Sequence, residues 1–337
     1  MMPEIPSRYT GPGLVDLQMN GYCGFDFNSD PDTWKADDFQ RMASALKSRG
    51  VAAVLPAIIT DDSELMKYRA SKFDAILKDN PELESIFPGL HIEGPFISPE
   101  DGPRGAHPEA FCSTPDDLPC FLSDLQKASG NRIKMFTLAP EIKGVMDIIG
   151  EADGMDICVG IGHTSAAPSI LDKAVHYGAR ISTHLGNGSH QTLPRHDNYI
   201  QYQLSLDSLF ASFIADGHHI PFYTLKNYIR TKGADRSVLV TDAISAADVG
   251  PGVYRLGNEE VVVRDDLHVS KPGEPNLAGS ALTLDCAVLN IVSHCDVPFD
   301  SAWKMASKIP ASLVGLTALP EVSVNISRDG FELIKQE

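Results

Sequence analysis

The sequence predicts an α/β fold in which eight parallel strands and their connecting helices close into a (β/α)8 barrel. Two observations support this prediction: short apolar segments recur along the chain, and helical patterns lie between them. The eight units extend over about 240 residues, which is a typical size for this barrel. Hydrophobic residues make up 43% of the 337 residues, and this proportion excludes a disordered chain.

The predicted strands are short runs rich in β-branched and other apolar residues. Such runs suit strands that are buried on both faces, as in a parallel sheet covered by helices. In chain order they are Leu14–Met19, Val51–Ile59, Pro88–Ile92, Ile133–Leu138, Ile157–Ile161, Ala179–Thr183, Phe210–Ala215 and Ser237–Thr241.

The segments between these strands have helical spacing. One helix is predicted from apolar residues at positions i, i+3, i+4 and i+7, namely Phe39, Met42, Ala43 and Leu46. A second is predicted around Leu118–Leu125, with Thr114 as its N-cap and Pro115 in its first turn. Several helices end in a glycine directly before the next strand, as helix-to-strand loops often do: Gly50, Gly130, Gly178 and Gly233.

An open, doubly wound sheet is the alternative architecture. It is disfavoured because no G-x-G-x-x-G pattern follows the first predicted strand. The barrel therefore remains the predicted fold.

The pattern changes after the eighth strand. Tyr254–Val269 alternates like a β-hairpin, with Gly257-Asn258 as its turn. Helical segments follow near Leu282–Ser293 and Asp300–Lys308, and Glu321–Glu337 is predicted to form a short strand or two. We interpret residues 1–337 as one domain, with a barrel core at about 12–315 and a short C-terminal appendage at 316–337.

Charge and cysteine content restrict the possible partners. The net charge of −17 is spread along the chain, which disfavours nucleic acid and anionic lipid as partners. No apolar run reaches the length of a membrane helix, and Met1–Thr10 lacks the order of a signal peptide. The six cysteines are scattered without a C-x-x-C pair, so we expect reduced thiols in a cytoplasmic protein.

Polar residues stand where several predicted strands end. Active sites of (β/α)8 barrels lie at these carboxyl ends, so Glu93, His163 and His184 are expected to share one rim. One oxygen and two nitrogen ligands with an open position are typical of a catalytic divalent metal such as Zn²⁺. Asp242 follows the eighth strand, where it could take a proton from a water activated by that metal. Alone, it could equally cap the next helix.

These residues lie in a series of motifs that resembles the N-acetylglucosamine-6-phosphate deacetylases of the amidohydrolase superfamily. The resemblance extends from Pro12 to about Gly315. Its landmarks occur in the same order along the chain: Asp16–Gly21 (DLQMNG), Leu55–Thr60 (LPAIIT), His91–Phe96 (HIEGPF), Thr137–Glu141 (TLAPE), Gly162–Ser165 (GHTS), Thr183–Leu185 (THL), Leu239–Ala243 (LVTDA) and Leu277–Thr283 (LAGSALT).

The resemblance implies a metal-dependent hydrolysis of the N-acetyl group of an amino sugar, most simply N-acetylglucosamine 6-phosphate. It implies that Glu93, His163 and His184 bind one divalent metal and that Asp242 is the general base and acid. Zinc is the first candidate, and Fe²⁺, Co²⁺ and Mn²⁺ also suit these ligands.

The same resemblance implies a set of substrate-binding residues. His107 corresponds to a histidine near the acyl carbonyl, Asn187 and Gly188 to a pair that contacts the sugar phosphate, and His219 to a further substrate-binding histidine. Arg195 corresponds to an arginine that reaches the phosphate in a neighbouring subunit, which implies a homodimer.

The first strand favours a single metal. Many relatives in the superfamily have H-x-H there, whereas this chain has Gln18 and Asn20, and amides are poor ligands beside imidazole. Binuclear relatives also use a modified lysine at the end of the fourth strand. Lys134 begins that strand here, so it lies at the wrong end.

Two departures keep other functions open. The family's β-sandwich, built from both chain ends, is expected to be absent or much reduced. In the loop after the sixth strand, Arg195 is followed by His-Asp where the family tends to have Glu-Pro. The alternatives are a deacetylase of another N-acyl sugar or amino-acid derivative, and a non-catalytic barrel that binds a sugar phosphate. We expect His176, His268 and His294 to be surface or structural residues, and His91 to pack near the metal without binding it.

Overall fold

Eight parallel strands form the central barrel of the computed structural model, which describes residues 3–257, 259–272 and 277–334. In order around the barrel they are β2 (Leu14–Met19), β5 (Val51–Ile59), β6 (Leu90–Glu93), β7 (Ile133–Leu138), β8 (Cys158–Ile161), β9 (Ala179–Ser182), β10 (Phe210–Ile214) and β11 (Ser237–Val240). The eight predicted strands are confirmed. Their buried apolar side chains explain why the sequence signal is continuous rather than alternating.

The barrel closes where the segment after β11 meets β2. The backbone N–H of Asp242 donates to the Gln18 carbonyl at 2.9 Å, and the Thr241 hydroxyl donates to the buried Asp16 carboxylate at 2.6 Å. This closure places the side chains at the end of the first strand next to Asp242. It therefore joins two parts of the site that lie more than 200 residues apart in the sequence.

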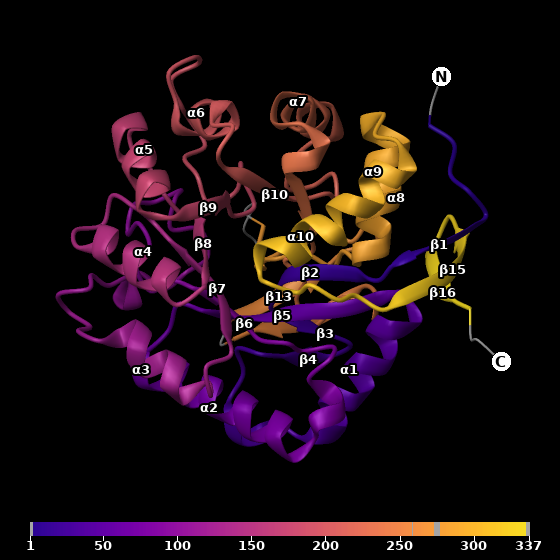
Figure 1. Cartoon of the computed structure of the whole chain (residues 1–337), viewed down its shortest axis with the longest axis horizontal. Helices are drawn as coiled ribbons and strands as arrows, with labels where there is room; N and C mark the ends of the chain where they lie inside the picture. Colours follow the sequence, from indigo (N-terminus) through magenta and orange to yellow (C-terminus); the bar gives the residue numbers. More distant parts are fainter. Residues whose placement is uncertain (1–2, 258, 273–276, 335–337) are drawn as a thin grey trace.

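Helices form a layer outside the strands (Figure 1). They are α1 (Ala36–Ser48), α2 (Ser63–Asp79), α3 (Phe121–Ala128), α4 (Val145–Gly154), α5 (Pro168–Tyr177), α6 (Tyr199–Ser205), α7 (Phe222–Lys232), α8 (Leu284–Cys295), α9 (Phe299–Met305) and α10 (Lys308–Leu313). The predicted apolar face of α1 is buried. Within the described part of the chain, no helix is both long enough and apolar enough to span a bilayer.

The predicted start of α3 is wrong. Thr114 does not cap this helix: its hydroxyl donates to Asp117 at 2.7 Å in a separate turn, and the helix begins at Phe121. Pro119 explains the difference, because a proline lacks the N–H of a helix interior and disfavours helical backbone at the preceding Leu118.

A small antiparallel sheet lies beside the barrel after β11. It consists of β12 (Gly252–Leu256), β13 (Glu259–Val263) and β14 (Val269–Ser270), so the predicted hairpin is confirmed and gains a third strand. Asn258 of the predicted turn lies outside the described residues. A second, two-stranded sheet of β3 (Gly21–Tyr22) and β4 (Phe25–Asp26) meets this region, since the Gly257 N–H donates to the Asp26 carboxylate at 2.6 Å.

The two chain ends share a separate sheet. Strand β1 (Arg8–Pro12) pairs with β15 (Glu321–Ser327), which pairs in turn with β16 (Gly330–Leu333) (Figure 1). Trp303 of α9 is buried beneath it and donates its indole N–H to the Pro12 carbonyl at 2.8 Å. The expected β-sandwich is thus reduced to three strands. The predicted C-terminal strands exist, but they pair with the N-terminal strand.

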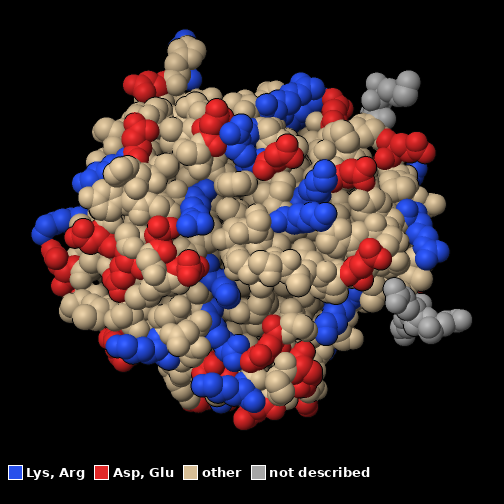
Figure 2. Space-filling view, in the orientation of Figure 1, with Lys and Arg blue, Asp and Glu red and all other residues tan. Residues whose placement is uncertain are grey.

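Figure 2 shows acidic and basic side chains interspersed on the visible face of the molecule. This agrees with the spread of charge along the sequence. The six cysteines are all free, and Cys158 and Cys295 are buried.

Candidate metal and substrate site

The ends of the barrel strands open into a cavity of about 770 Å³. Glu93 is the last residue of β6, His163 and His184 follow β8 and β9 by two residues each, and Asp242 follows β11 by two. All four side chains line this cavity. The predicted convergence on one rim of the barrel is therefore confirmed.

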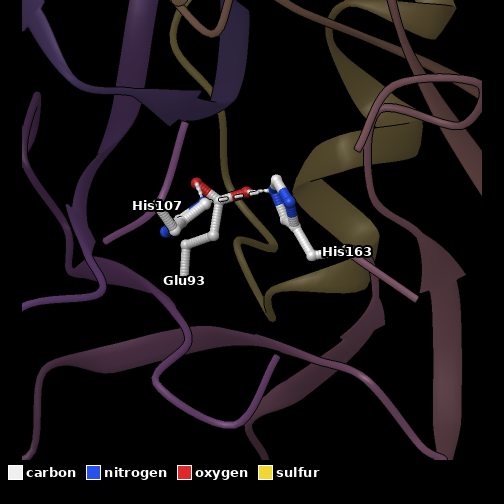
Figure 3. Close-up of side chains that lie close together, drawn as sticks. All are labelled: Glu93, His107 and His163. Carbon is white, nitrogen blue, oxygen red and sulfur yellow. Dashed lines mark hydrogen bonds and ion pairs between the residues drawn. The ribbon is translucent and has the colours of Figure 1, made fainter. Parts of the chain in front are cut away.

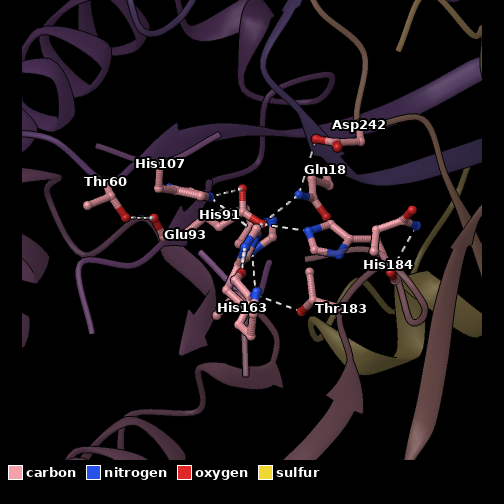
Figure 4. Close-up of polar contacts among 12 residues, drawn as sticks. Gln18, Thr60, His91, Glu93, His107, His163, Thr183, His184 and Asp242 are labelled. Carbon is pink, nitrogen blue, oxygen red and sulfur yellow. Dashed lines mark hydrogen bonds and ion pairs between the residues drawn. The ribbon is translucent and has the colours of Figure 1, made fainter. Parts of the chain in front are cut away.

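Glu93 is the centre of the group (Figure 4). Its Oε1 lies 2.9 Å from His184 Nε2 and 3.2 Å from His163 Nε2. The Gln18 amide also donates to this oxygen, at 3.0 Å. All four residues are buried, so the carboxylate has these side chains rather than bulk water as its neighbours.

Three of the residues at the strand ends have unusual backbone conformations. The φ angles of His163, His184 and Asp242 are 51°, 31° and 49°. Residues other than glycine rarely adopt positive φ, and such strain persists only where the surroundings impose it. These turns direct the three side chains into the cavity, and we interpret the shared strain as a mark of a functional site.

The donor atoms fit a metal ion. His163 Nδ1 lies 2.9 Å from the Pro103 carbonyl, which can only accept, so Nδ1 carries a proton. In the neutral ring, Nε2 then carries a lone pair, and this lone pair repels the Glu93 carboxylate oxygen that it faces. A cation between the two atoms would turn this repulsion into two favourable contacts. Two ligands of a tetrahedral zinc ion lie about 3.3 Å apart, close to the separations around Glu93 Oε1. The spacing around Glu93 Oε1 therefore suits one divalent ion held with His163 and His184. Among the described residues, the three whose donor atoms all lie within 4.8 Å of one another are Glu93, His107 and His163 (Figure 3).

The surroundings of the two carboxylates shift their pKa values in opposite directions, downward for Glu93 and upward for Asp242. Burial alone would raise the pKa of Glu93, but the neighbouring His163 and His184 hold it well below its ordinary value. Burial, together with the charge of Glu93, raises the pKa of Asp242 to about 6. Glu93 is thus suited to remain an anionic ligand, whereas Asp242 can exchange a proton near neutral pH.

Two amides of the first strand hold Asp242. Asn20 Nδ2 donates to its Oδ1 at 2.7 Å. Gln18 Nε2 donates to the same atom at 3.2 Å (Figure 4). Sequence reasoning treated Gln18 and Asn20 only as replacements for metal-binding imidazoles and missed this contact. Among the described residues, no helix begins within forty positions after Asp242, so the helix-cap interpretation of this residue is wrong.

The predicted substrate residues also line the cavity, with one exception. His107 is buried, with Nε2 at 3.2 Å from His163 Nε2, and burial lowers its pKa to about 3. Asn187 and Gly188 follow His184 on the same wall. A side chain at position 188 would meet His163 at 2.7 Å, so this position requires glycine.

His219 lines the cavity in a fixed orientation. Its Nδ1 lies 2.6 Å from the Asp216 carboxylate, which leaves Nε2 as the ring nitrogen available to a substrate. Sequence reasoning did not identify Asp216 as this partner. The sequence contained a signal for this contact, because Asp216 follows β10 by two residues and precedes His219 by three.

Arg195 is the exception. It is exposed and is not among the described residues that line the cavity. Lys271, which sequence reasoning missed, is the one lysine or arginine among those lining residues. It follows β14, in a segment whose place beside the cavity no periodicity in the sequence indicates.

The remaining histidines lie outside the ligand group. His91 is buried and its Nε2 lies 2.8 Å from the Thr137 hydroxyl. His294 stacks on Phe222, and His268 lies beside His218. These positions agree with the structural interpretations made from the sequence.

Comparisons with known proteins identify the family. No family model matches the chain. The N-acetylglucosamine-6-phosphate deacetylase of Homo sapiens is 34% identical over 319 residues, covering 92% of this chain and 75% of the human protein. The Bos taurus enzyme is 33% identical over 316 residues, covering 90% of this chain and 74% of its own length.

A solved structure agrees with these relatives. The crystal structure of the N-acetylglucosamine-6-phosphate deacetylase of Thermotoga maritima has a TM-score of 0.84 and 28% identity, and covers 98% of this chain and 88% of that one. Barrel, site and sequence thus lead to one assignment. The chain belongs to the N-acetylglucosamine-6-phosphate deacetylase family.

Proposed function

We propose that this protein hydrolyses the acetamide of N-acetylglucosamine 6-phosphate to glucosamine 6-phosphate and acetate. The observation that carries the proposal is the group of Glu93, His163 and His184 with Asp242 beside it in one cavity. Family membership supports the choice of substrate. The cavity volume of about 770 Å³ lies within the range for small-molecule sites.

Glu93, His163 and His184 are the proposed ligands of one divalent metal, with zinc as the first candidate. When bound, such an ion acts as a Lewis acid on the amide carbonyl and lowers the pKa of the attacking water. Gln18 and Asn20 donate to the carboxylates of this group and offer no imidazole, which supports one metal rather than two.

Asp242 is the proposed acid and base of both half-steps. As a carboxylate it accepts a proton from the attacking water, and it then returns this proton to the nitrogen of the leaving amine. The hydrogen bonds from Asn20 and Gln18 hold its Oδ1 in place, which leaves Oδ2 for the reacting proton.

The remaining residues are proposed to bind the sugar. His107 lies beside the ligand group, where it can donate to the acyl oxygen, while Asn187, Gly188 and His219 lie on the wall where the phosphate is expected. The free cysteines agree with a cytoplasmic location, where thiols stay reduced.

Release of acetate tests this proposal. The purified, metal-loaded protein should release acetate faster from N-acetylglucosamine 6-phosphate than from unphosphorylated N-acetylglucosamine. Faster release from another N-acyl compound would move the assignment to a different deacetylase, which the altered loop around Arg195 makes the main alternative. Binding of the sugar phosphate without any release would indicate a non-catalytic barrel.

Arg195→Ala should raise KM for the phosphorylated sugar and leave KM for the unphosphorylated sugar nearly unchanged. Arginine binds phosphate through two parallel hydrogen bonds, and loss of a charged hydrogen bond costs about 1.5–3 kcal/mol, or roughly 10- to 100-fold in KM. Since Arg195 does not line its own cavity, we propose that it reaches the site of a partner subunit in a homodimer.

Mixed dimers test the partner contact. Arg195→Ala and Asp242→Asn subunits, each impaired alone, should partly restore activity when they are combined, because one site then has both residues. The matched comparison is Lys271→Met. A phosphate-selective rise in KM in that variant, without one in Arg195→Ala, would place the phosphate contact within one subunit and contradict the role of Arg195.

A further inference from the structure

The junction between β11 and β2 differs from the other strand junctions of the barrel. Seven neighbouring strand pairs, from β2 and β5 round to β10 and β11, form parallel ladders. Within the described residues β11 and β2 form no such ladder, and the one bridge between the two segments joins Met19 to Ala243, beyond the end of β11. Other contacts must therefore close the barrel at the point where Asp242 lies.

A buried carboxylate takes the place of a ladder at this junction. Asp16 lies within β2 and is 2% exposed. Its Oδ1 accepts the backbone N–H of Thr241 at 3.2 Å, and its Oδ2 accepts the Thr241 hydroxyl at 2.6 Å. Oδ1 also accepts the N–H of Gln18, in its own strand, at 3.2 Å. One side chain thus joins the two sides of the junction.

The Thr241 hydroxyl extends this contact to the backbone around Asp242. It accepts the N–H of Ala243 at 3.2 Å, so it spans the residue between them. Asp242 has a φ of 49°, a conformation that persists only where its surroundings impose it. Because the hydroxyl has a single proton, its donation to Asp16 leaves only lone pairs to face the Ala243 N–H. The Asp16 carboxylate therefore helps to impose the turn that directs Asp242 into the cavity.

Gln18 gives Asp16 a second route to the same residue. The Gln18 carbonyl accepts the N–H of Asp242 at 2.9 Å, and the Gln18 amide donates to Asp242 Oδ1 at 3.2 Å. Since Asp16 accepts the Gln18 N–H, it orients the residue that makes both of these contacts. A change at Asp16 would thus reach Asp242 from both sides of the junction.

We propose that Asp16 is a positioning residue for the acid–base reaction and acts on Asp242 through Thr241 and Gln18. Asp16 is not among the described residues that line the cavity, so it can act only through these neighbours. The inference rests on the role proposed for Asp242. Misplacement of a reacting group by about 1 Å can cost about 100-fold in rate, so loss of this contact should lower kcat rather than raise KM.

Thr241→Val and Thr241→Ser test the hydroxyl. Valine has the shape of threonine, but it can neither donate to Asp16 nor accept from Ala243. Thr241→Val should lower kcat for acetate release by about 10- to 100-fold with little change in KM. Thr241→Ser keeps the hydroxyl, so its kcat should stay near the wild-type value. Burial raises the pKa of Asp16 to about 7, and rates measured at pH 8 therefore report the ionised carboxylate.

Asp16→Asn tests the carboxylate itself. The amide oxygen can still accept the two backbone N–H groups, but the amide nitrogen cannot accept the Thr241 proton, so kcat should fall as in Thr241→Val. In the Asp242→Asn background the same change should cause no further loss, because Asp16 acts through Asp242. An additional loss in the double variant would show that Asp16 supports the barrel in general and would contradict the proposal.

Ser237→Ala is the matched control for loss of a buried hydroxyl in β11. Ser237 lies at the opposite end of this strand and donates to the Gly233 carbonyl at 2.9 Å. Its removal should lower the melting temperature and leave kcat at the wild-type value. Two results would overturn the proposal: an equal fall of kcat in Ser237→Ala, or a wild-type kcat in folded Thr241→Val and Asp16→Asn.

A crystal structure of Thr241→Val separates this inference from the proposed function. The Asp242 backbone should leave its φ of 49°, and its carboxylate should lose the 2.7 Å contact with Asn20. Asp16→Asn serves as the second variant if Thr241→Val does not fold. An unchanged turn would exclude the positioning role, whatever the protein hydrolyses. Failure of the proposed function gives a different result, because the wild-type protein would then release no acetate while the turn is still displaced in the variant.

Discussion

Asp242→Asn should lower kcat by about 10²–10⁴-fold, the range for loss of a general acid or base. An amide cannot accept the proton of the attacking water. It keeps the side-chain oxygen that accepts hydrogen bonds from Asn20 and Gln18, so fold and metal content should stay near those of the wild type. Acetate release, metal analysis and thermal melting measure the three properties on one preparation.

Asp101→Asn is the matched control for charge. Asp101 lies at the exposed edge of the same cavity, so this change removes one negative charge without touching Asp242. Its kcat should remain close to wild type. Near-full activity in Asp242→Asn would contradict the acid–base role and would show that Asp242 serves only as a structural hydrogen-bond partner of Asn20 and Gln18.

The pH profile gives a second readout of Asp242. Burial and the charge of Glu93 raise its pKa to about 6, and a base works only when it is ionised. Hence kcat/KM should fall as the pH drops, with a slope of one proton and a midpoint no higher than about 6. A bound cation favours the carboxylate and moves this midpoint downward. An acidic limb that persists unchanged in Asp242→Asn would belong to another group.

The barrel could be predicted because its signal is local. The bounds of β2, β5 and β7 coincide with the predicted runs, since strands buried on both faces need continuous apolar residues. The convergence of Glu93, His163 and His184 followed from one geometric rule, that parallel strands present their carboxyl ends to the same rim. The strand bounds and the convergence of these three residues could both be inferred without knowing the path of any loop.

What could not be predicted depends on loops and on contacts across the closure. Gln18 and Asn20 point to Asp242, which is 224 and 222 residues away, and no spacing reveals such a partner. The segment after β14 brings Lys271 to the cavity, while the long loop before α6 leaves Arg195 exposed. Loop paths are set by tertiary contacts, and periodic patterns do not report them.

His184→Ala and His163→Ala should each lose metal and activity together. In the free protein these rings lie 2.9 and 3.2 Å from the Glu93 carboxylate, and either deletion leaves two of the three proposed ligands. Ligand loss should weaken metal binding by more than the about 10–100-fold found when an outer partner of a ligand is removed. Metal analysis after dialysis, with acetate release on the same samples, measures both effects.

The control and the stoichiometry complete this prediction. His91→Gln removes a buried imidazole close to the same group, but one that contacts Thr137, so its metal content should match the wild type. The wild type should hold about one functional ion per chain, because the Gln18 and Asn20 amides are poor ligands beside imidazole. Two tightly bound ions, both required for turnover, would contradict the single-metal site and would assign these amides to coordination rather than to holding Asp242.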